Sequence, residues 1–141
     1  MKNRNTLILI LVIVLLVSLA ALAVAIICSM FPVAAPISYP GADSITEFLL
    51  IQNEGSSINI EPADFGEFLQ NISNSQPTRA WSVQDYPTVQ TYYTIEISTP
   101  DRSYRYFIYT ENSQVYIEPP YEGVYKTTQQ FLDLVTEYFN K

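Results

Sequence analysis

The stretch TYYTIEISTPDRSYRYFIYTENSQVYIE, residues 91–118, decides the fold of this chain. Tyr93, Ile95 and Ile97 alternate with more polar residues, and this period of two predicts a strand with one buried face. The pattern therefore predicts a three-stranded antiparallel meander. The elements that follow the first strand are a turn at 100–102, a strand at 104–109, a turn at 111–114 and a strand at 115–118.

Upstream of this meander, the sequence predicts a hairpin and a helix. Residues 44–52 are an apolar run rich in β-formers, a turn cluster around Gly55 follows, and residues 57–60 return as a short strand. Pro62 stands where the first residue of a helix tolerates proline. The apolar residues behind it recur at helical spacing and predict one buried face, made by Phe65, Phe68, Leu69 and Ile72.

Downstream of the meander, residues 127–138 predict a last helix. Thr127 and Gln130 have the spacing of a capping box, and Phe131, Val135 and Tyr138 share one apolar face. The element order is then ββαβββα. This order predicts an α+β domain with an antiparallel sheet and both helices on one of its faces.

The N-terminal segment is different in kind, because Leu7 to Phe31 are 25 consecutive residues without a charge. A helix of that length rises about 37 Å, enough to cross a hydrocarbon core of about 30 Å as a single-pass transmembrane helix. Lys2 and Arg4 precede the run, and the next basic residue is Arg79. The positive-inside rule therefore predicts residues 1–6 as a cytoplasmic tip and the C-terminal domain outside the cytoplasmic membrane.

Two other interpretations of this segment stay open. Ala23, Val24 and Ala25 make an A-x-A-like cleavage site, and cleavage near Ala25 would release a secreted domain. The apolar run continues past this site, whereas the apolar part of a signal peptide usually has about 7 to 15 residues, which favours a retained anchor. Cys28 also suggests a lipoprotein cysteine, but the bulky Ile27 precedes it where lipoprotein processing favours a small residue.

The apolar segment divides the rest of the chain into a stalk and one domain. Residues 32–42 contain Pro32, Pro36 and Pro40, and proline-rich composition predicts a stiff, extended stalk. Residues 43–141 are then long enough for one domain with its own core. The only cysteine of the chain lies before residue 32, so this domain contains no disulfide.

The charge of the exported part restricts its partners. The chain has a net charge of −7, and since Lys2 and Arg4 are the only charged residues before residue 32, residues 32–141 carry −9. Nucleic acid backbones and anionic lipid headgroups repel such a surface, so we expect no nucleic acid partner and no membrane contact other than the anchor. Cationic partners, neutral peptides and sugars are compatible with it.

The residues that most enzymes use are missing. The chain has no histidine, and no cysteine outside the apolar run, so the commonest general base, the thiol nucleophile and the usual zinc ligands are absent. We expect no catalytic residues, no cofactor and no metal site. Carboxylates are the remaining option for a glycan-acting enzyme, but the pattern favours solvated charges on outward faces. The candidate pairs are Glu96 with Glu118, and Asp64 with Glu67.

Tyrosine is the distinctive residue of the exported part. All 11 tyrosines lie between Tyr39 and Tyr138. Tyrosine suits the recognition of peptides, proteins or sugars, but strands also use it for cross-strand packing. Within residues 116–125, two prolines and a glycine fix an irregular backbone, which predicts either a recognition loop that displays aromatic rings or a structural strand-to-helix connection. The candidate recognition residues are Pro119, Pro120, Tyr121, Gly123 and Tyr125.

Two sequence patterns in this part resemble a domain-of-unknown-function family of Gram-positive bacteria. One is a PT-R-SV-D-P pattern that begins at Pro77 and ends at Pro87, and the other is an I-E-x-P-Y-x-G-hydrophobic-Y pattern within residues 116–125. The resemblance extends over about residues 43–139. It implies a small exported domain with one fold behind a signal or a membrane anchor, and it implies no activity and no catalytic residue.

The combined patterns favour a non-catalytic recognition domain, tethered to the membrane, that binds a peptide, a protein or cell-wall material outside the cytoplasm. The alternative is an inhibitor or immunity-type protein against a secreted or envelope enzyme or toxin, because an acidic surface suits a basic target. The second alternative is the carboxylate-based glycan-acting enzyme. The patterns leave the oligomeric state open.

Overall fold

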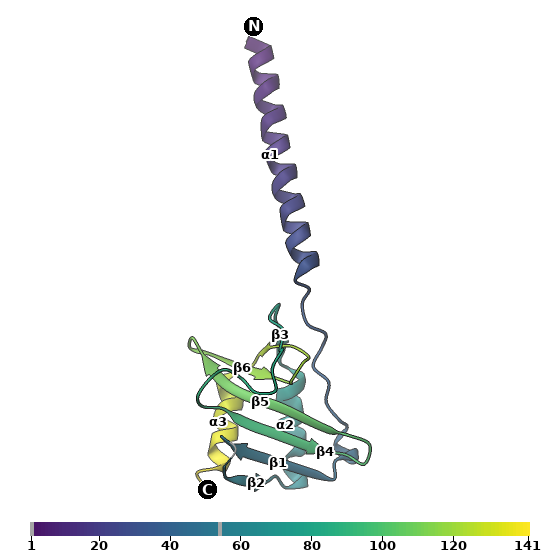
Figure 1. Ribbon diagram of the computed structural model, residues 1–141, viewed down its shortest axis with the longest axis vertical. Helices are drawn as coiled ribbons and strands as arrows, with labels where there is room; N and C mark the ends of the chain where they lie inside the picture. Colours follow the sequence, from purple (N-terminus) through teal and green to yellow (C-terminus); the bar gives the residue numbers. More distant parts are fainter. Residues whose placement is uncertain (1, 54) are drawn as a thin grey trace. The chain divides into compact units, whose positions relative to one another are not determined.

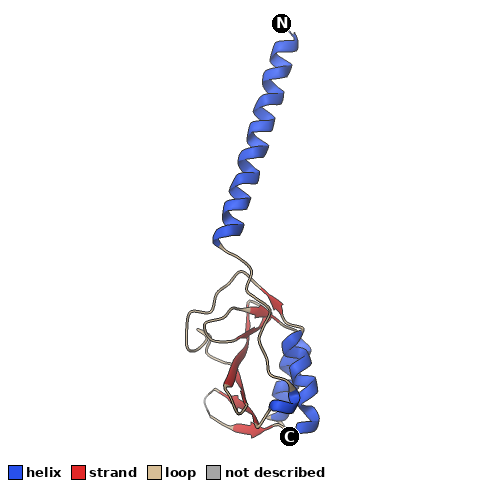
Figure 2. Cartoon of the chain, turned by 90° about the vertical axis from the view of Figure 1, so that its right-hand side faces the viewer, coloured by secondary structure: helices blue, strands red, loops and turns tan. Residues whose placement is uncertain are grey.

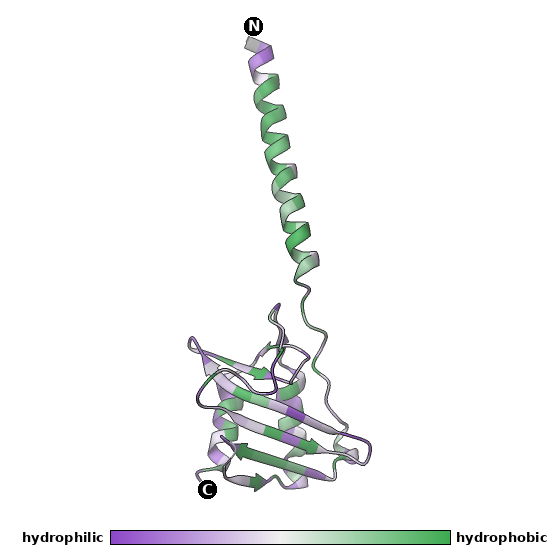
Figure 3. Ribbon diagram, viewed as in Figure 1, coloured by the Kyte–Doolittle hydropathy of each residue, from purple (hydrophilic) through white to green (hydrophobic). Residues whose placement is uncertain are grey.

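A computed structural model describes residues 2–53 and 55–141, and the chain divides into two compact units, Met1–Pro32 and Val33–Lys141. The first unit contains the helix α1 (Lys2–Met30), which begins before the predicted apolar run and ends one residue before its last residue. Its stretch Asn3–Met30 is long and apolar enough to cross a membrane, and a signal sequence near an N-terminus meets the same criterion. Figure 3 shows apolar residues along almost all of α1.

The second unit is built on one antiparallel sheet, to which its described residues contribute seven strands in the order β2-β1-β4-β5-β6-β7-β3 (Figure 1). The predicted meander and the predicted hairpin β1–β2 are both confirmed. The strands β3 and β7 were not predicted, because a strand of two residues has no period to detect. The strands are β1 (Glu47–Gln52), β2 (Ser57–Asn59), β3 (Gln76–Pro77), β4 (Tyr93–Ser98), β5 (Ser103–Glu111), β6 (Gln114–Glu118) and β7 (Tyr125–Lys126).

The helices α2 (Phe65–Ser73) and α3 (Gln129–Tyr138) lie on one side of this sheet, as Figure 2 shows. Short 3₁₀ turns, η1 (Ala42–Ser44) and η2 (Pro62–Asp64), precede β1 and α2. The four apolar residues predicted for the buried face of α2 are all buried. The predicted capping box is wrong by one residue, since the N-cap of α3 is Thr128, whose side chain accepts a hydrogen bond from the Phe131 N–H. The α+β class is confirmed.

The hydrophobic core lies between these helices and the face of the sheet that they cover, which we call the inner face. Phe68 of α2 is central, because its ring centroid is 5.2 Å from that of Phe48, 5.5 Å from Tyr138 and 6.1 Å from Phe131. Complete burial of a large apolar side chain contributes about 1.5–3 kcal/mol. The inner face therefore supplies most of the stability. Its fully buried strand residues are Phe48, Leu50, Ile95, Ile97, Tyr106, Ile108, Ile117 and Tyr125.

The opposite side of the sheet, the outer face, is covered in part by the irregular connection between β3 and β4. The rings of Tyr86 and Tyr92 from this connection pack on Phe107 of β5, with centroids 5.7 and 5.5 Å away. Beside them, Arg105 Nη2 lies 2.7 Å from Glu96 Oε1. A groove of about 450 Å³ stays open along this face. The outer face is thus more polar and less completely filled than the inner face.

The segment predicted as a stalk packs on the domain instead. Ala34 and Ile37 are buried, so the compact unit begins at Val33 and not at residue 43. The segment binds the domain because its apolar side chains Ala34 and Ile37 are buried there and its carbonyl groups accept hydrogen bonds. Two tyrosine hydroxyls hold it by donating to its backbone: Tyr125 Oη to Ala35 O and Tyr106 Oη to Ser38 O, each at 2.6 Å.

Candidate functional site

The predicted recognition loop, residues 119–125, divides into an exposed part and a buried part. The side chain of Tyr121 is 61% exposed, whereas that of Tyr125 is only 1% exposed and belongs to the core. Gly123 is also structural, because a Cβ atom at this position would lie 2.6 Å from the Cβ of Ala34. The expectation that this loop displays both aromatic rings is therefore corrected: Tyr121 is displayed and Tyr125 is not.

Tyr121 is held in its exposed position by an unusual backbone and two hydrogen bonds. Its φ of 61° lies in the left-handed region, which costs a residue with a side chain about 1–2 kcal/mol. Its N–H donates to Ser82 Oγ at 3.2 Å, and its O–H donates to Asp85 Oδ1 at 2.6 Å. The hydrogen bond to Asp85 raises the pKa of the Tyr121 hydroxyl, which stays a donor at neutral pH. The ring is fixed although solvent surrounds most of it.

A second loop, residues 78–88, lies beside Tyr121. Its backbone pairs with the first loop, since the Thr78 N–H donates to Val124 O and the Val124 N–H donates to Ala80 O, both at 3.1 Å. It exposes three large side chains, Trp81 at 54%, Val83 at 71% and Tyr86 at 47%. We call residues 78–88 together with 119–124 the two-loop surface.

Residues 78–88 were not predicted as a binding element. An irregular loop has no hydrophobic period, and its approach to residues 119–124 depends on contacts between distant parts of the chain. One signal was present in the sequence, because the only tryptophan of the chain, Trp81, stands with Val83 in an otherwise polar stretch.

A hollow of about 160 Å³ opens on the outer face beneath the two-loop surface. Glu118, at the end of β6, is only 7% exposed, and its Oε2 accepts a hydrogen bond of 2.7 Å from the Tyr109 hydroxyl. Burial, and then the hydrogen bond to Glu118, raise the pKa of Tyr109, so that hydroxyl keeps its proton. A carboxylate therefore lies at the wall of a small, partly apolar hollow. The lining residues are Trp81, Val83, Gln84, Pro87, Thr88, Tyr109, Glu118 and Val124.

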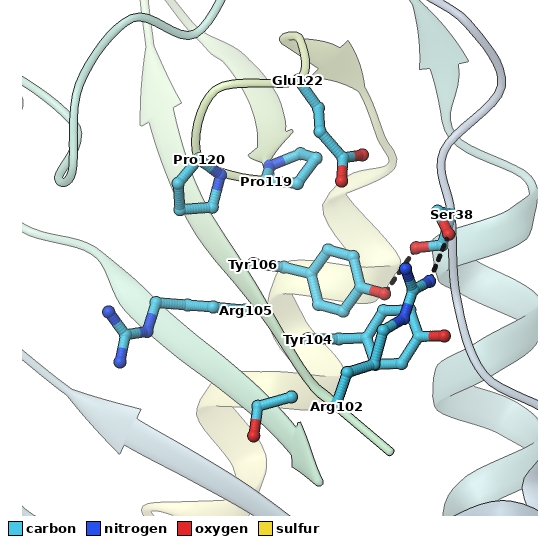
Figure 4. A pocket seen from close by; sticks show the side chains of 9 residues that line it. Ser38, Arg102, Tyr104, Arg105, Tyr106, Pro119, Pro120 and Glu122 are labelled. Carbon is cyan, nitrogen blue, oxygen red and sulfur yellow. Dashed lines mark hydrogen bonds between the residues drawn. The ribbon is translucent and has the colours of Figure 1, made fainter. Parts of the chain in front are cut away.

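A second hollow, of about 230 Å³, lies beside Pro119 and Pro120 and is shown in Figure 4. The Arg102 guanidinium is 4.0 Å from the centroid of the Tyr104 ring, and its Nη2 donates to Ser38 Oγ at 3.0 Å. Burial is the main cause that raises the pKa of the Tyr106 hydroxyl, which donates to the Ser38 carbonyl. Arg102 and Tyr106 of this hollow thus bind the N-terminal segment of the domain, which gives them a structural role.

The carboxylates considered for a glycan-acting enzyme have separate partners. Glu96 of β4 pairs with Arg105, while Glu118 accepts from Tyr109, and β5 lies between their two strands. Asp64 accepts a hydrogen bond of 2.6 Å from the Tyr138 hydroxyl. Within residues 2–53 and 55–141, no group of three or more histidine, cysteine or acidic side chains is placed to hold a metal ion.

The fold and this site define a small α+β domain with a two-loop aromatic surface, in a chain that begins with one apolar helix. The chain belongs to the DUF5301 family, described as "Domain of unknown function (DUF5300)", whose profile matches residues 33–126. This confirms the expected relation to a family of domains of unknown function.

The solved structures include a similar fold. The chain resembles the NMR structure of a protein from Ruminococcus gnavus with a TM-score of 0.58 and 25% sequence identity, over 69% of this chain and 99% of that one. No curated protein matches the chain. The family match begins at Val33, which is also the first residue of the second compact unit.

Proposed function

We propose that residues 33–141 are a non-catalytic recognition domain, held by the N-terminal helix at the outer side of a cytoplasmic membrane. In this proposal the two-loop surface binds a peptide, a protein or a cell-wall component. The observation that carries the proposal is Tyr121, which has a left-handed backbone and two hydrogen bonds and is nevertheless 61% exposed. A strained backbone at a residue whose side chain stays exposed is typical of a binding site.

The neighbours of Tyr121 support the same function. Together with Tyr121, they give the surface four large exposed side chains on two loops that hydrogen-bond to each other. The other three are Trp81, Val83 and Tyr86. Tryptophan and tyrosine are the residues that most often dominate binding energies at interfaces. Because these loops are already ordered, binding would lose little conformational entropy.

The proposed location rests on the N-terminal segment. Lys2 and Arg4 precede the apolar run of α1, so the positive-inside rule favours a recognition domain on the outer side, and the length of α1 suits a retained anchor. Protease treatment of intact cells should digest residues 33–141, and the mass of the mature protein should include α1. A mature protein without α1 would instead show that the N-terminal segment is cleaved near Ala25 and is not a retained anchor.

The absence of catalysis is supported by the residue inventory. The chain has no histidine, and Glu96, Glu118 and Asp64 are each engaged by a side chain of the domain itself. A pair of carboxylates that shares one substrate needs both groups to face the same space. Glu96 and Glu118 do not line a common hollow.

Crosslinking in intact cells tests the recognition surface directly. A photo-crosslinking amino acid in place of Val83 is expected to give adducts with a partner molecule, because the Val83 side chain is 71% exposed beside Trp81. The same amino acid in place of Glu137, an exposed residue of α3, is the control and should give none. Trp81→Ala and Tyr121→Ala should each reduce the Val83 adducts severalfold. Equal adducts at both positions, or none at either, would contradict the proposal.

An inhibitor or immunity-type role is the second candidate. The observation that favours it is the net charge of −9 on residues 32–141, which suits a basic enzyme or toxin. Deletion of the gene would then sensitise cells to that target, whereas loss of a passive binder would not.

A further inference from the structure

We propose that the hollow beneath the two-loop surface binds one cationic side chain, lysine or arginine, of a partner peptide or protein, with Glu118 as its counter-charge. This inference rests on the proposed function and names the ligand class of the same surface. In this proposal, the ion pair with Glu118 determines specificity, and the exposed aromatic side chains of the two-loop surface supply contact area.

Glu118 is a buried acid without a cation. Its Oε2 accepts from Tyr109, and the ion pairs formed among the described residues are Arg105–Glu96 and Lys141–Glu137, neither of which includes it. A carboxylate removed from water is unfavourable unless a partner compensates for its lost hydration. An incoming ammonium or guanidinium group would supply that compensation through charge-assisted hydrogen bonds.

The second oxygen of Glu118 is accessible from the hollow. Over residues 2–53 and 55–141, every fully buried side-chain nitrogen or oxygen has a hydrogen-bond partner. Oε1 of Glu118 has no such partner in the protein, so it is not fully buried, and Glu118 is one of the residues that line the hollow. A ligand can therefore reach Oε1 without breaking the hydrogen bond between Oε2 and Tyr109.

The walls of the hollow fit the rest of a cationic side chain. Trp81, Val83 and Val124 give it apolar surfaces on which a lysine or arginine methylene chain can lie, and the indole ring of Trp81 can attract the charge at its end. The hollow has a volume of about 160 Å³. That space takes one long side chain and excludes a folded segment.

The charge of the whole domain favours the same ligand class. Residues 32–141 carry −9, and a surface of one sign raises the local concentration and the association rate of ligands of the other sign. The hollow beside Pro119 offers no equivalent site, because two cations already line it. Arg102 is bound to Ser38 and lies over Tyr104, and Arg105 pairs with Glu96.

The single tryptophan makes the test specific, since all tryptophan fluorescence of the chain comes from Trp81 in the wall of the hollow. The full chain, in nanodiscs of neutral phosphatidylcholine at fixed ionic strength, is titrated with the capped peptides Gly-Lys-Gly, Gly-Arg-Gly and Gly-Gln-Gly. We expect a saturable change in fluorescence with the lysine and arginine peptides, and none with the glutamine peptide.

Glu118→Gln keeps the shape of the side chain and removes its charge, so it should weaken binding of the cationic peptides about tenfold or more. The matched control is Glu111→Gln, at an exposed end of β5, which should bind like the wild type. A second variant, Thr88→Lys, places a cation at the exposed rim of the hollow and should abolish the response by occupying the site from within. This variant keeps the test informative if Glu118→Gln fails to fold.

Equal responses to all three peptides, or wild-type affinity in both Glu118→Gln and Thr88→Lys, would overturn the cation site. If the cationic peptides fail while crosslinks at Val83 persist, this inference is wrong and the recognition surface stands. If the crosslinks fail as well, the proposed function is also wrong.

Discussion

The two faces of the sheet differ in what fills them. On the inner face, α2 and α3 cover residues such as Leu50, Ile95 and Ile97, which are 0% exposed. On the outer face, an irregular connection covers only part of the strands and leaves hollows of about 450 and 160 Å³. Burial of apolar area drives folding, whereas an open hollow beside exposed aromatic rings leaves contacts for a ligand. Stability and binding should therefore respond to substitutions on different faces.

The largest expected effect is on the inner face. Phe68→Ala removes a ring that contacts Phe48, Phe131 and Tyr138, and it should lower the free energy of unfolding by about 3–5 kcal/mol. The core cluster lies entirely within residues 33–141, so urea unfolding of this unit, followed by circular dichroism, measures the loss. Val83→Ala is the outer-face control and should change stability by less than about 0.5 kcal/mol. Similar losses in both variants would refute the difference between the faces.

The inner face was also the part that the sequence predicted best. The alternation at residues 93–97 and the helical spacing of Phe65, Phe68, Leu69 and Ile72 are local patterns, and each one directly reports which side of an element is buried. The meander, the hairpin and both helices followed from such patterns.

The outer face and the N-terminal segment could not be predicted in the same way, because their contacts join distant residues. The partner of the Tyr125 hydroxyl, Ala35, is 90 residues away in the sequence, and Asp85 is 36 residues from Tyr121. No period indicates such pairs. The proline content of the segment before the sheet carried no information about what Ala34 and Ile37 would contact.

A smaller effect is expected where that segment contacts the recognition loop. Gly123→Ala would place a methyl group 2.6 Å from the Cβ of Ala34, so residues 33–38 must shift, and we expect a loss of about 1–3 kcal/mol in urea unfolding. Limited proteolysis should then cut these residues faster. The double variant Ala34→Gly with Gly123→Ala removes the clash and should recover much of this loss. A double variant less stable than Gly123→Ala would mean that the contact is not the cause.

The smallest effect on stability, combined with a large effect on binding, is expected at Tyr121. Tyr121→Gly relieves the strain of a left-handed backbone, and this relief stabilises the variant by about 1 kcal/mol. The same substitution removes the hydrogen bond to Asp85, which costs about 0.5–1.5 kcal/mol, so the two effects on stability nearly cancel. Crosslinking from position 83 should nevertheless fall severalfold, because the exposed ring is gone.

Tyr121→Phe separates the ring of Tyr121 from its hydroxyl. It keeps the exposed ring and loses only the hydrogen bond to Asp85, so it should retain most of the crosslinking from position 83. If Tyr121→Gly crosslinks like the wild type, the ring does not contribute to binding. If instead Tyr121→Gly unfolds the domain, residues 119–124 stabilise the fold as the inner face does. Either result would contradict the distinction between an inner face that stabilises the fold and an outer face that binds a partner. Unchanged stability together with lost crosslinking is the combination that only a binding role explains.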